Sequence, residues 1–335
     1  MPIIKQAGAQ TGAQLANPLQ LSFVERLKAG RVVPILSDAA IVDLTIGGQQ
    51  RLVTRLAEFM AYPMPDKERV VQVVRFYKIH NGLKEQDVKS HYLNFVKNHI
   101  YLLAQTEGAS ADLLAEAEAQ VDDLTASDFA HILGYPRFLA GASDPLLLLA
   151  NLPIKVILTT SPHTFIEDAL RKAGKQPLTE LCRWRRELDS IDPAITAGYR
   201  PTAQQPLVYH LHGLDKYPDS LVLSEDDHLE FLVNICQGAG NNAMDRVHGL
   251  VRQALFDDLI LLGFSLSDWG FRALYAGLIK PNGRQEDRGV CCLQLAPDAV
   301  ERQYLQEYLE REAKFEVFWG TLDQYALELR RLLNL

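Results

Sequence analysis

The sequence predicts an α/β protein in which a doubly wound parallel sheet carries an inserted layer of helices. Residues 154–160 (IKVILTT) are β-branched and almost entirely apolar, as expected of a strand buried on both faces. From Asp144 onward, short apolar runs alternate with helical patterns, which is typical of a parallel sheet wound in both directions. Residues 50–140 show helical periodicity alone, and this indicates the inserted layer.

Composition and charge exclude several classes of protein. The chain has 335 residues, of which 47% are hydrophobic and 23% charged, and its formal net charge is −8. A strongly basic nucleic-acid binder is therefore excluded. No apolar run approaches the roughly 18–20 residues that a membrane-spanning helix needs, and residues 1–20 lack the apolar centre of a secretory signal. We expect a cytoplasmic protein that binds neither nucleic acid nor a membrane.

The first part of the chain predicts one strand followed by helices. We expect residues 1–30 to form an arm with a short helix, and residues 31–335 to form one α/β domain. The first strand is expected at Val32 to Leu36. Apolar residues at helical spacing then predict helices within an insertion at about 50–140, namely over 52–59, 70–77, 92–103 and 112–124.

The rest of the chain predicts the remaining strands of the sheet. They are expected at 154–160, 178–184, 207–211, 221–223, 259–263, 289–295 and 316–319. The segment from Thr164 to Glu167 has the pattern of a capping box, and Ser224 to Asp227 similarly predicts a helix start. Residues 322–335 predict an amphipathic closing helix.

Ligands of such sheets bind beyond the carboxyl ends of the strands, so the residues there are the candidates for a site. His210 and His212 lie two apart at the end of one strand, which places them on the same face. Two histidines can be metal ligands, but no third ligand is evident, and we expect no metal site. The strand ends are followed by Ser37 to Ala40, Thr160 to His163, His212–Gly213 and Gly263 to Asp268.

The order of these strand-end motifs resembles that of the sirtuin-like family, and more specifically its prokaryotic branch found in antiviral defence systems. The resemblance covers roughly residues 30–280 and is clearest over 144–275. It rests on Thr159-Thr160-Ser161, Leu211-His212-Gly213, the segment from Ser220 to His228, and the segment from Leu262 to Asp268.

The resemblance implies a Rossmann-like sheet with a helical module and a nicotinamide dinucleotide, NAD, bound across it. In the defence branch the implied reaction is hydrolysis of NAD at the bond between nicotinamide and ribose. The four cysteines form no C-x-x-C pair, so the zinc ribbon of the deacetylase branch is missing, which argues against protein deacetylation.

The resemblance also implies roles for individual residues. His212 matches the catalytic histidine, and Ser161 stands where the family has an asparagine that holds the ribose and the attacking water. His163 is expected to be an exposed loop histidine. The residues that match cofactor-binding positions are Ser37, Asp38, Ala39, Thr160, Gly213, Gly263, Ser265 and Asp268.

Two departures from the family pattern bear on activity. Ser161 offers one hydrogen-bonding group where an asparagine offers two. Ser37, Asp38 and Ala39 replace a Gly-Ala-Gly turn that lets the backbone approach the pyrophosphate. A carboxylate of Asp38 in the cleft would repel phosphate, unless Mg²⁺ bridges the two. Alternatively, Asp38 is turned outward as a helix cap.

The sequence therefore leaves catalytic activity open. The first function it predicts is hydrolysis of NAD to nicotinamide and ADP-ribose. One alternative is a catalytically degenerate module that binds a partner, either another defence protein or a second copy of the chain. The other is hydrolysis or sensing of a different nucleotide. Trp269, Phe271 and Tyr275 are expected to be core or interface aromatics.

Overall fold

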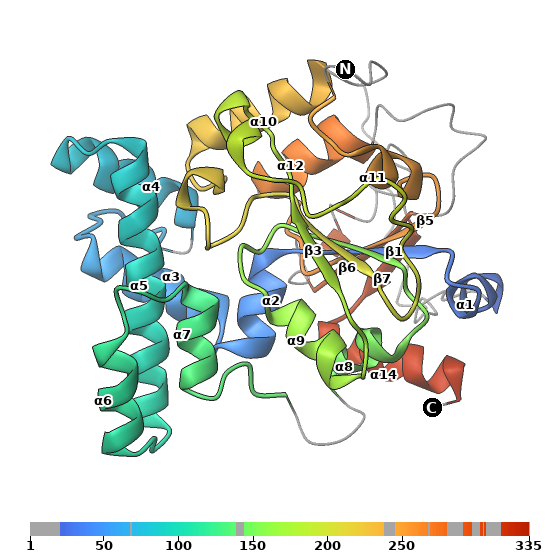
Figure 1. Ribbon diagram of the computed structural model, residues 1–335, viewed down its shortest axis with the longest axis horizontal. Helices are drawn as coiled ribbons and strands as arrows, with labels where there is room; N and C mark the ends of the chain where they lie inside the picture. The colour runs from blue at the N-terminus through green and yellow to red at the C-terminus, as the bar shows by residue number, and fades with distance from the viewer. Residues whose placement is uncertain are drawn as a thin grey trace, which may run out of the picture.

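The fold is built on one seven-stranded sheet in which all strands are parallel, in the order β3-β4-β2-β1-β5-β6-β7 (Figure 1). The computed structural model describes residues 21–67, 69–138, 144–237, 245–266, 269–279, 291–296, 302–303, 305 and 316–334. The predicted α/β class and the doubly wound sheet are confirmed. The strands are β1 (Val32–Leu36), β2 (Val156–Thr159), β3 (Leu178–Leu181), β4 (Leu207–His210), β5 (Asp258–Leu262), β6 (Cys291–Leu295) and β7 (Glu316–Trp319).

The central strands are apolar because both of their faces are covered. All residues of β1, β2, β4 and β5 are buried, as the nearly continuous apolar runs predict. The helices on one face are α1 (Leu21–Lys28), α2 (Asp38–Thr45), α8 (Pro145–Asn151), α9 (Phe165–Lys172) and α14 (Leu322–Leu333). Those on the other are α10 (Glu225–Gln237), α11 (Gly249–Ala254) and α12 (Trp269–Leu274).

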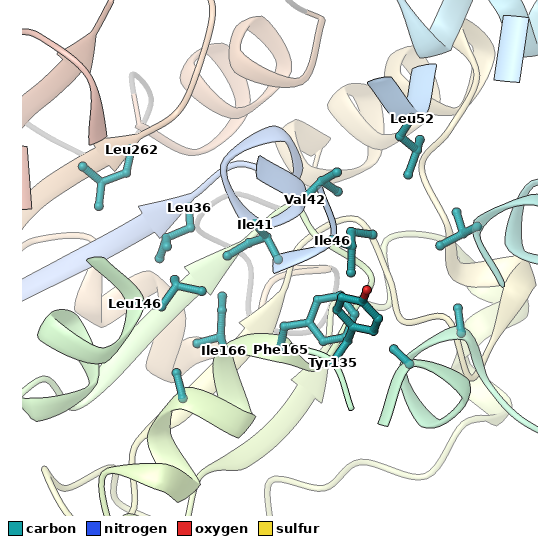
Figure 2. Packing of buried hydrophobic residues seen from close by; sticks show 14 of the residues in the cluster. Leu36, Ile41, Val42, Ile46, Leu52, Tyr135, Leu146, Phe165, Ile166 and Leu262 are labelled. Carbon is teal, nitrogen blue, oxygen red and sulfur yellow. The ribbon is translucent and has the colours of Figure 1, made fainter. Parts of the chain in front are cut away.

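Two hydrophobic cores result, one on each side of the sheet. Figure 2 shows part of the first, where Leu36 and Leu262 from adjacent strands pack near Ile41 and Ile166 from helices α2 and α9. The second core contains Trp184 and Phe231, both fully buried. Because helices cover both faces, a ligand can reach the strands only at an edge or an end of the sheet.

A layer of helices lies beyond the carboxyl ends of the strands (Figure 1). It comprises α3 (Gln49–Phe59), α4 (Val70–Asn81), α5 (Glu85–Thr106), α6 (Ala111–Ala119) and α7 (Ala126–Ile132). Its members bury apolar stripes of helical spacing, such as Leu52, Val53 and Leu56 in α3. α5 makes a polar contact with the first turn of α10, and α7 makes one with the loop that follows β4, so the helical layer faces the end of the sheet where ligands bind.

Two of the predicted strands differ from the described structure. The strand predicted at 221–223 is absent, because the Val222 amide donates to the His212 carbonyl and the Leu223 amide to the Asp227 carboxylate instead of to a strand. β3 ends at Leu181, three residues earlier than predicted. Residues 1–20 and 289–290 lie outside the described part of the chain. Within the described part, no helix is both long and apolar enough to cross a membrane.

Candidate functional site

The turn after β1 begins a helix and is tied to the end of β5. Ser37 is the N-cap of α2, because its Oγ accepts a hydrogen bond from the Ala40 amide at 3.0 Å. The same hydroxyl donates to the Gly263 carbonyl at 2.6 Å. Ala39 lies in the first turn of this helix. The β1–α2 turn is therefore held against β5, at the point where the sheet winds in two directions.

Asp38 faces the end of the neighbouring strand β2. Its backbone amide donates to Thr160 Oγ1 at 2.9 Å, and its carboxylate accepts a hydrogen bond from Ser161 Oγ at 2.8 Å. The alternative in which Asp38 is an outward helix cap is wrong, since Ser37 is the cap. The structure brings three of the predicted site residues together: Asp38, Thr160 and Ser161. Asp38 therefore places a carboxylate in the turn that the resemblance aligns with Gly-Ala-Gly.

Gly263 is required for close packing of β5 on α2. Its φ is +72°, and a Cβ there would overlap Ala40 and lie 2.8 Å from Ser37 Oγ. Its amide donates to Gln294 Oε1 at 2.9 Å. This packing accounts for the glycine without any ligand. Ser265 follows on the exposed loop, whereas Ser267 and Asp268 lie outside the described residues.

His212 is buried at the carboxyl end of β4. Its ring meets the edges of the His228 and Phe231 rings, with centroid distances of 5.2 and 5.1 Å. Its Nε2 is buried and has no hydrogen-bond partner among the described residues. The pKa of His212 lies well below its usual value, mainly because the ring is buried and secondly because His228 is near. Asp227 has the opposite, smaller effect on this pKa. The imidazole is therefore uncharged near neutral pH.

His210 belongs to a different network, and its expected placement beside His212 is wrong. Its Nδ1 donates to the Ser161 carbonyl at 2.7 Å, and its Nε2 lies 2.9 Å from Glu167 Oε1. Burial lowers the pKa of His210, but Glu167 and the Ser161 carbonyl outweigh it and raise that pKa. Glu167 also accepts from Thr179 Oγ1, so the capping box predicted for Thr164 and Glu167 does not form.

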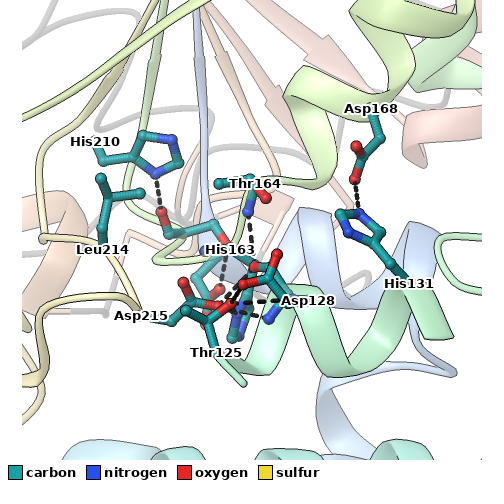
Figure 3. A network of polar contacts seen from close by, with 12 residues as sticks. Thr125, Asp128, His131, His163, Thr164, Asp168, His210, Leu214 and Asp215 are labelled. Carbon is teal, nitrogen blue, oxygen red and sulfur yellow. Dashed lines mark hydrogen bonds and ion pairs between the residues drawn. The ribbon is translucent and has the colours of Figure 1, made fainter. Parts of the chain in front are cut away.

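His163 is fully buried, in contrast to the exposed loop position expected from the sequence. Its Nδ1 lies 3.2 Å from Asp215 Oδ2, and that oxygen also accepts from the amide and hydroxyl of Ser127 (Figure 3). Burial raises the pKa of Asp215, but His163 and Ser127 outweigh it and the pKa is lowered. This network joins the loops after β2 and β4 to α7 of the helical layer.

A second buried pair joins the helical layer to the first turn of α10. Lys89 of α5 is 0% exposed, and its Nζ lies 2.7 Å from Asp227 Oδ1. The only sequence signal for either residue is the helix start predicted at Ser224 to Asp227, which is confirmed: the Asp227 amide donates to Ser224 Oγ, and the Ser224 amide donates to Asp227 Oδ2. Nothing in the sequence marks Lys89 or Asp215 as site residues.

Within the described part of the chain, no three His, Cys, Asp or Glu residues form a group that could hold a metal ion.

The buried, uncharged His212 predicts a pH-dependent stability. Its pKa in the folded protein lies below the value of about 6.5 in an unfolded chain, so the unfolded state binds the extra proton as pH falls below about 6.5. The free energy of unfolding should then decrease, by up to about 1.4 kcal/mol per pH unit from this group. Urea titrations of the wild type and of His212→Asn between pH 5 and 8 measure this. The variant should show the shallower dependence, and equal slopes would contradict the assignment.

Comparison with known proteins agrees with the sheet and the strand-end motifs. Residues 155–314 match the family model of the SIR2-like domain, a range that begins just before β2 and includes His212 and Gly263. β1, with Ser37 and Asp38, lies before the matched range, as does the helical layer. No curated protein matches the chain. The SIR2-like match and the all-parallel sheet together support a sirtuin-like family for this chain.

Proposed function

We propose that this chain binds NAD at the carboxyl ends of β1, β2 and β4 and hydrolyses the bond between nicotinamide and ribose. The observation that carries the proposal is His212, whose uncharged imidazole has a buried Nε2 without a partner among the described residues. A buried polar nitrogen left unbonded is unfavourable, and a ribose hydroxyl or a water molecule would satisfy it. The SIR2-like match at 155–314 supports an NAD-related ligand.

The reaction requires a base and a held ribose. The bond between ribose C1′ and the nicotinamide nitrogen breaks, and its electron pair leaves with nicotinamide, which becomes neutral. Water adds to the oxocarbenium-like carbon that remains and loses one proton, so the products are nicotinamide, ADP-ribose and a proton. His212 accepts this proton as general base. Ser161 Oγ donates to Asp38 and accepts from the His163 amide at 3.4 Å, which leaves one lone pair to accept a hydrogen bond from the ribose or the water.

The residues fit the ribose end of NAD better than its pyrophosphate. Asp38 is the first residue of α2, where a Rossmann-like fold places phosphate on the helix N-terminus. Its carboxylate, 2.8 Å from Ser161 Oγ, favours a second function: a module that binds a partner protein, a second copy of the chain or another nucleotide without cleaving NAD. Among defence proteins, such a module would serve as a sensing or partner-binding subunit.

The experiment that separates these functions follows nicotinamide release from NAD, with the chain alone and with the proteins encoded beside its gene. Release by the wild type is expected. Calorimetric titration with NAD and with ADP-ribose runs in parallel. Binding without release would replace hydrolysis by the sensing function, and absence of both would leave the partner-binding module.

Replacing Asp38 with Asn tests the charge at the β1 turn. The amide keeps an acceptor for Ser161 and removes the repulsion of phosphate, so NAD affinity should rise about tenfold, equivalent to about 1.4 kcal/mol. Asp43→Asn on the same helix is the matched control, since Asp43 is exposed and contacts the Gln49 amide instead. Calorimetry with and without Mg²⁺ measures both variants. Weaker binding of Asp38→Asn, seen only with Mg²⁺, would show that the carboxylate holds a cation.

A further inference from the structure

The helical layer and His212 are joined by a continuous set of buried polar contacts. Lys89 of α5 pairs with Asp227 Oδ1 at 2.7 Å, and both side chains are buried. Asp227 Oδ2 accepts from the amides of Leu223 and Ser224, each at 3.0 Å. One carboxylate therefore holds both a lysine of the helical layer and the backbone that leads into α10.

This backbone reaches His212 by two routes. His228 Nδ1 donates to the Ser224 carbonyl at 2.8 Å, and the His228 ring packs edge-on against the His212 ring. In addition, the Val222 amide donates to the His212 carbonyl at 3.1 Å. A displacement of the segment 222–224 would therefore move both the ring that packs on His212 and the backbone of His212 itself.

We propose that Lys89 and Asp227 are positioning residues for His212: their ion pair fixes the segment 222–224 against the helical layer and balances the negative charge that faces the imidazole. The assignment of His212 as base rests on the proposed function, but the placement and charge of its ring do not. Lys89 does not touch the site of reaction and acts through Asp227 alone.

The charges around the pair agree with this role. His212 faces His228 and Asp227 of α10. From α12 it faces Gly270, which has no side chain. Asp268 lies outside the described residues. Lys89 also lies near Arg185 and Glu85, which have opposite charges. Lys89 is thus the partner that neutralises Asp227, with Lys78 contributing a weaker attraction from α4. Without Lys89, only the weaker attraction of Lys78 would offset the charge of Asp227, which would then act more strongly on His212 and favour the imidazolium.

The test measures the ring ¹⁵N chemical shifts of His212 between pH 5 and 8, with the signal assigned from a His212→Gln sample. In the wild type the ring should remain uncharged over this range. In Lys89→Met the pKa of His212 should rise by about one unit or more and enter the range. Lys89→Arg, which keeps the charge, should behave as the wild type. The double variant Lys89→Met/Asp227→Asn should restore the uncharged ring.

Two outcomes would overturn the proposal. One is a folded Lys89→Met protein whose His212 ring remains uncharged throughout the range. The other is a double variant that keeps the raised pKa, because the effect would then come from packing and not from charge. If Lys89→Met does not fold, Lys89→Gln is used instead, since it keeps a hydrogen-bond donor for Asp227 and removes only the charge. If the His212 ring shifts change as expected but the wild type releases no nicotinamide, Lys89 and Asp227 are supported as positioning residues and hydrolysis is rejected.

Discussion

Replacing His212 with Ala is expected to slow nicotinamide release by about 10²- to 10⁴-fold, the usual contribution of a general base. Most of the NAD affinity should remain, because the proposed site would hold the phosphates and adenosine at other strand ends. The loss should therefore appear in kcat and not in KM. Steady-state kinetics of release, combined with calorimetric titration of NAD, measure the two effects separately.

The matched control is His131→Ala. His131 is a partly exposed histidine of α7 that pairs with Asp168 of α9. Its loss should leave release within about twofold of the wild type, since a surface pair contributes little. A His212→Ala protein that is folded and releases nicotinamide at the rate of the control would remove His212 from the mechanism.

The sheet is predictable from the sequence because burial on both faces leaves a local signal. β1, β2, β4 and β5 are short apolar runs between helical patterns, and each prediction lies within three residues of the observed strand. The segment 221–223 shows the limit of this signal. It is as apolar as a strand, but its amides bond to the His212 carbonyl and the Asp227 carboxylate, and only the three-dimensional fold brings these acceptors within reach.

The sequence predicts candidate site residues at the strand ends, but it does not predict which residues they contact. Glu167 has the spacing of a capping box, yet it pairs with His210, 43 residues further along the chain. His163 follows a strand and would be exposed in an ordinary loop, yet Asp215 and the helical layer enclose it. Sequence spacing reports neighbours along one element, and it contains no information on which loops two parallel strands place side by side.

Asp38 illustrates the same limit for chemistry. The sequence left its carboxylate with two orientations, into the cleft or outward as a cap, and both satisfy local rules. The orientation is decided by Ser161, which lies 123 residues further along the chain. Ser161 follows β2, the strand next to β1 in the sheet. The electrostatic effect of a residue on a ligand therefore depends on the order of the strands in the sheet. The sequence predicts the class of sheet but not this order.

Within the site, the backbone should be most sensitive to substitution at Gly213, in the loop that carries His212. Gly213 has φ +86°, and a Cβ there would overlap the backbone and the hydroxyl of Ser220. Ser220 has little freedom to move, because its carbonyl accepts from the buried Trp184 indole at 2.8 Å and its hydroxyl donates to the Tyr217 carbonyl at 2.6 Å. The added methyl group would therefore displace a fixed segment of backbone.

Gly213→Ala should consequently lower the free energy of unfolding by more than about 4 kcal/mol, a loss that combines backbone strain with steric overlap. Gly174→Ala is the matched control. Gly174 also has positive φ, +78°, but a Cβ there has open space, so only the strain of about 1 kcal/mol is expected. Urea denaturation midpoints of both variants measure the difference. Equal losses would mean that the His212–Ser220 loop yields to the methyl group, and that its conformation does not depend on a glycine at 213.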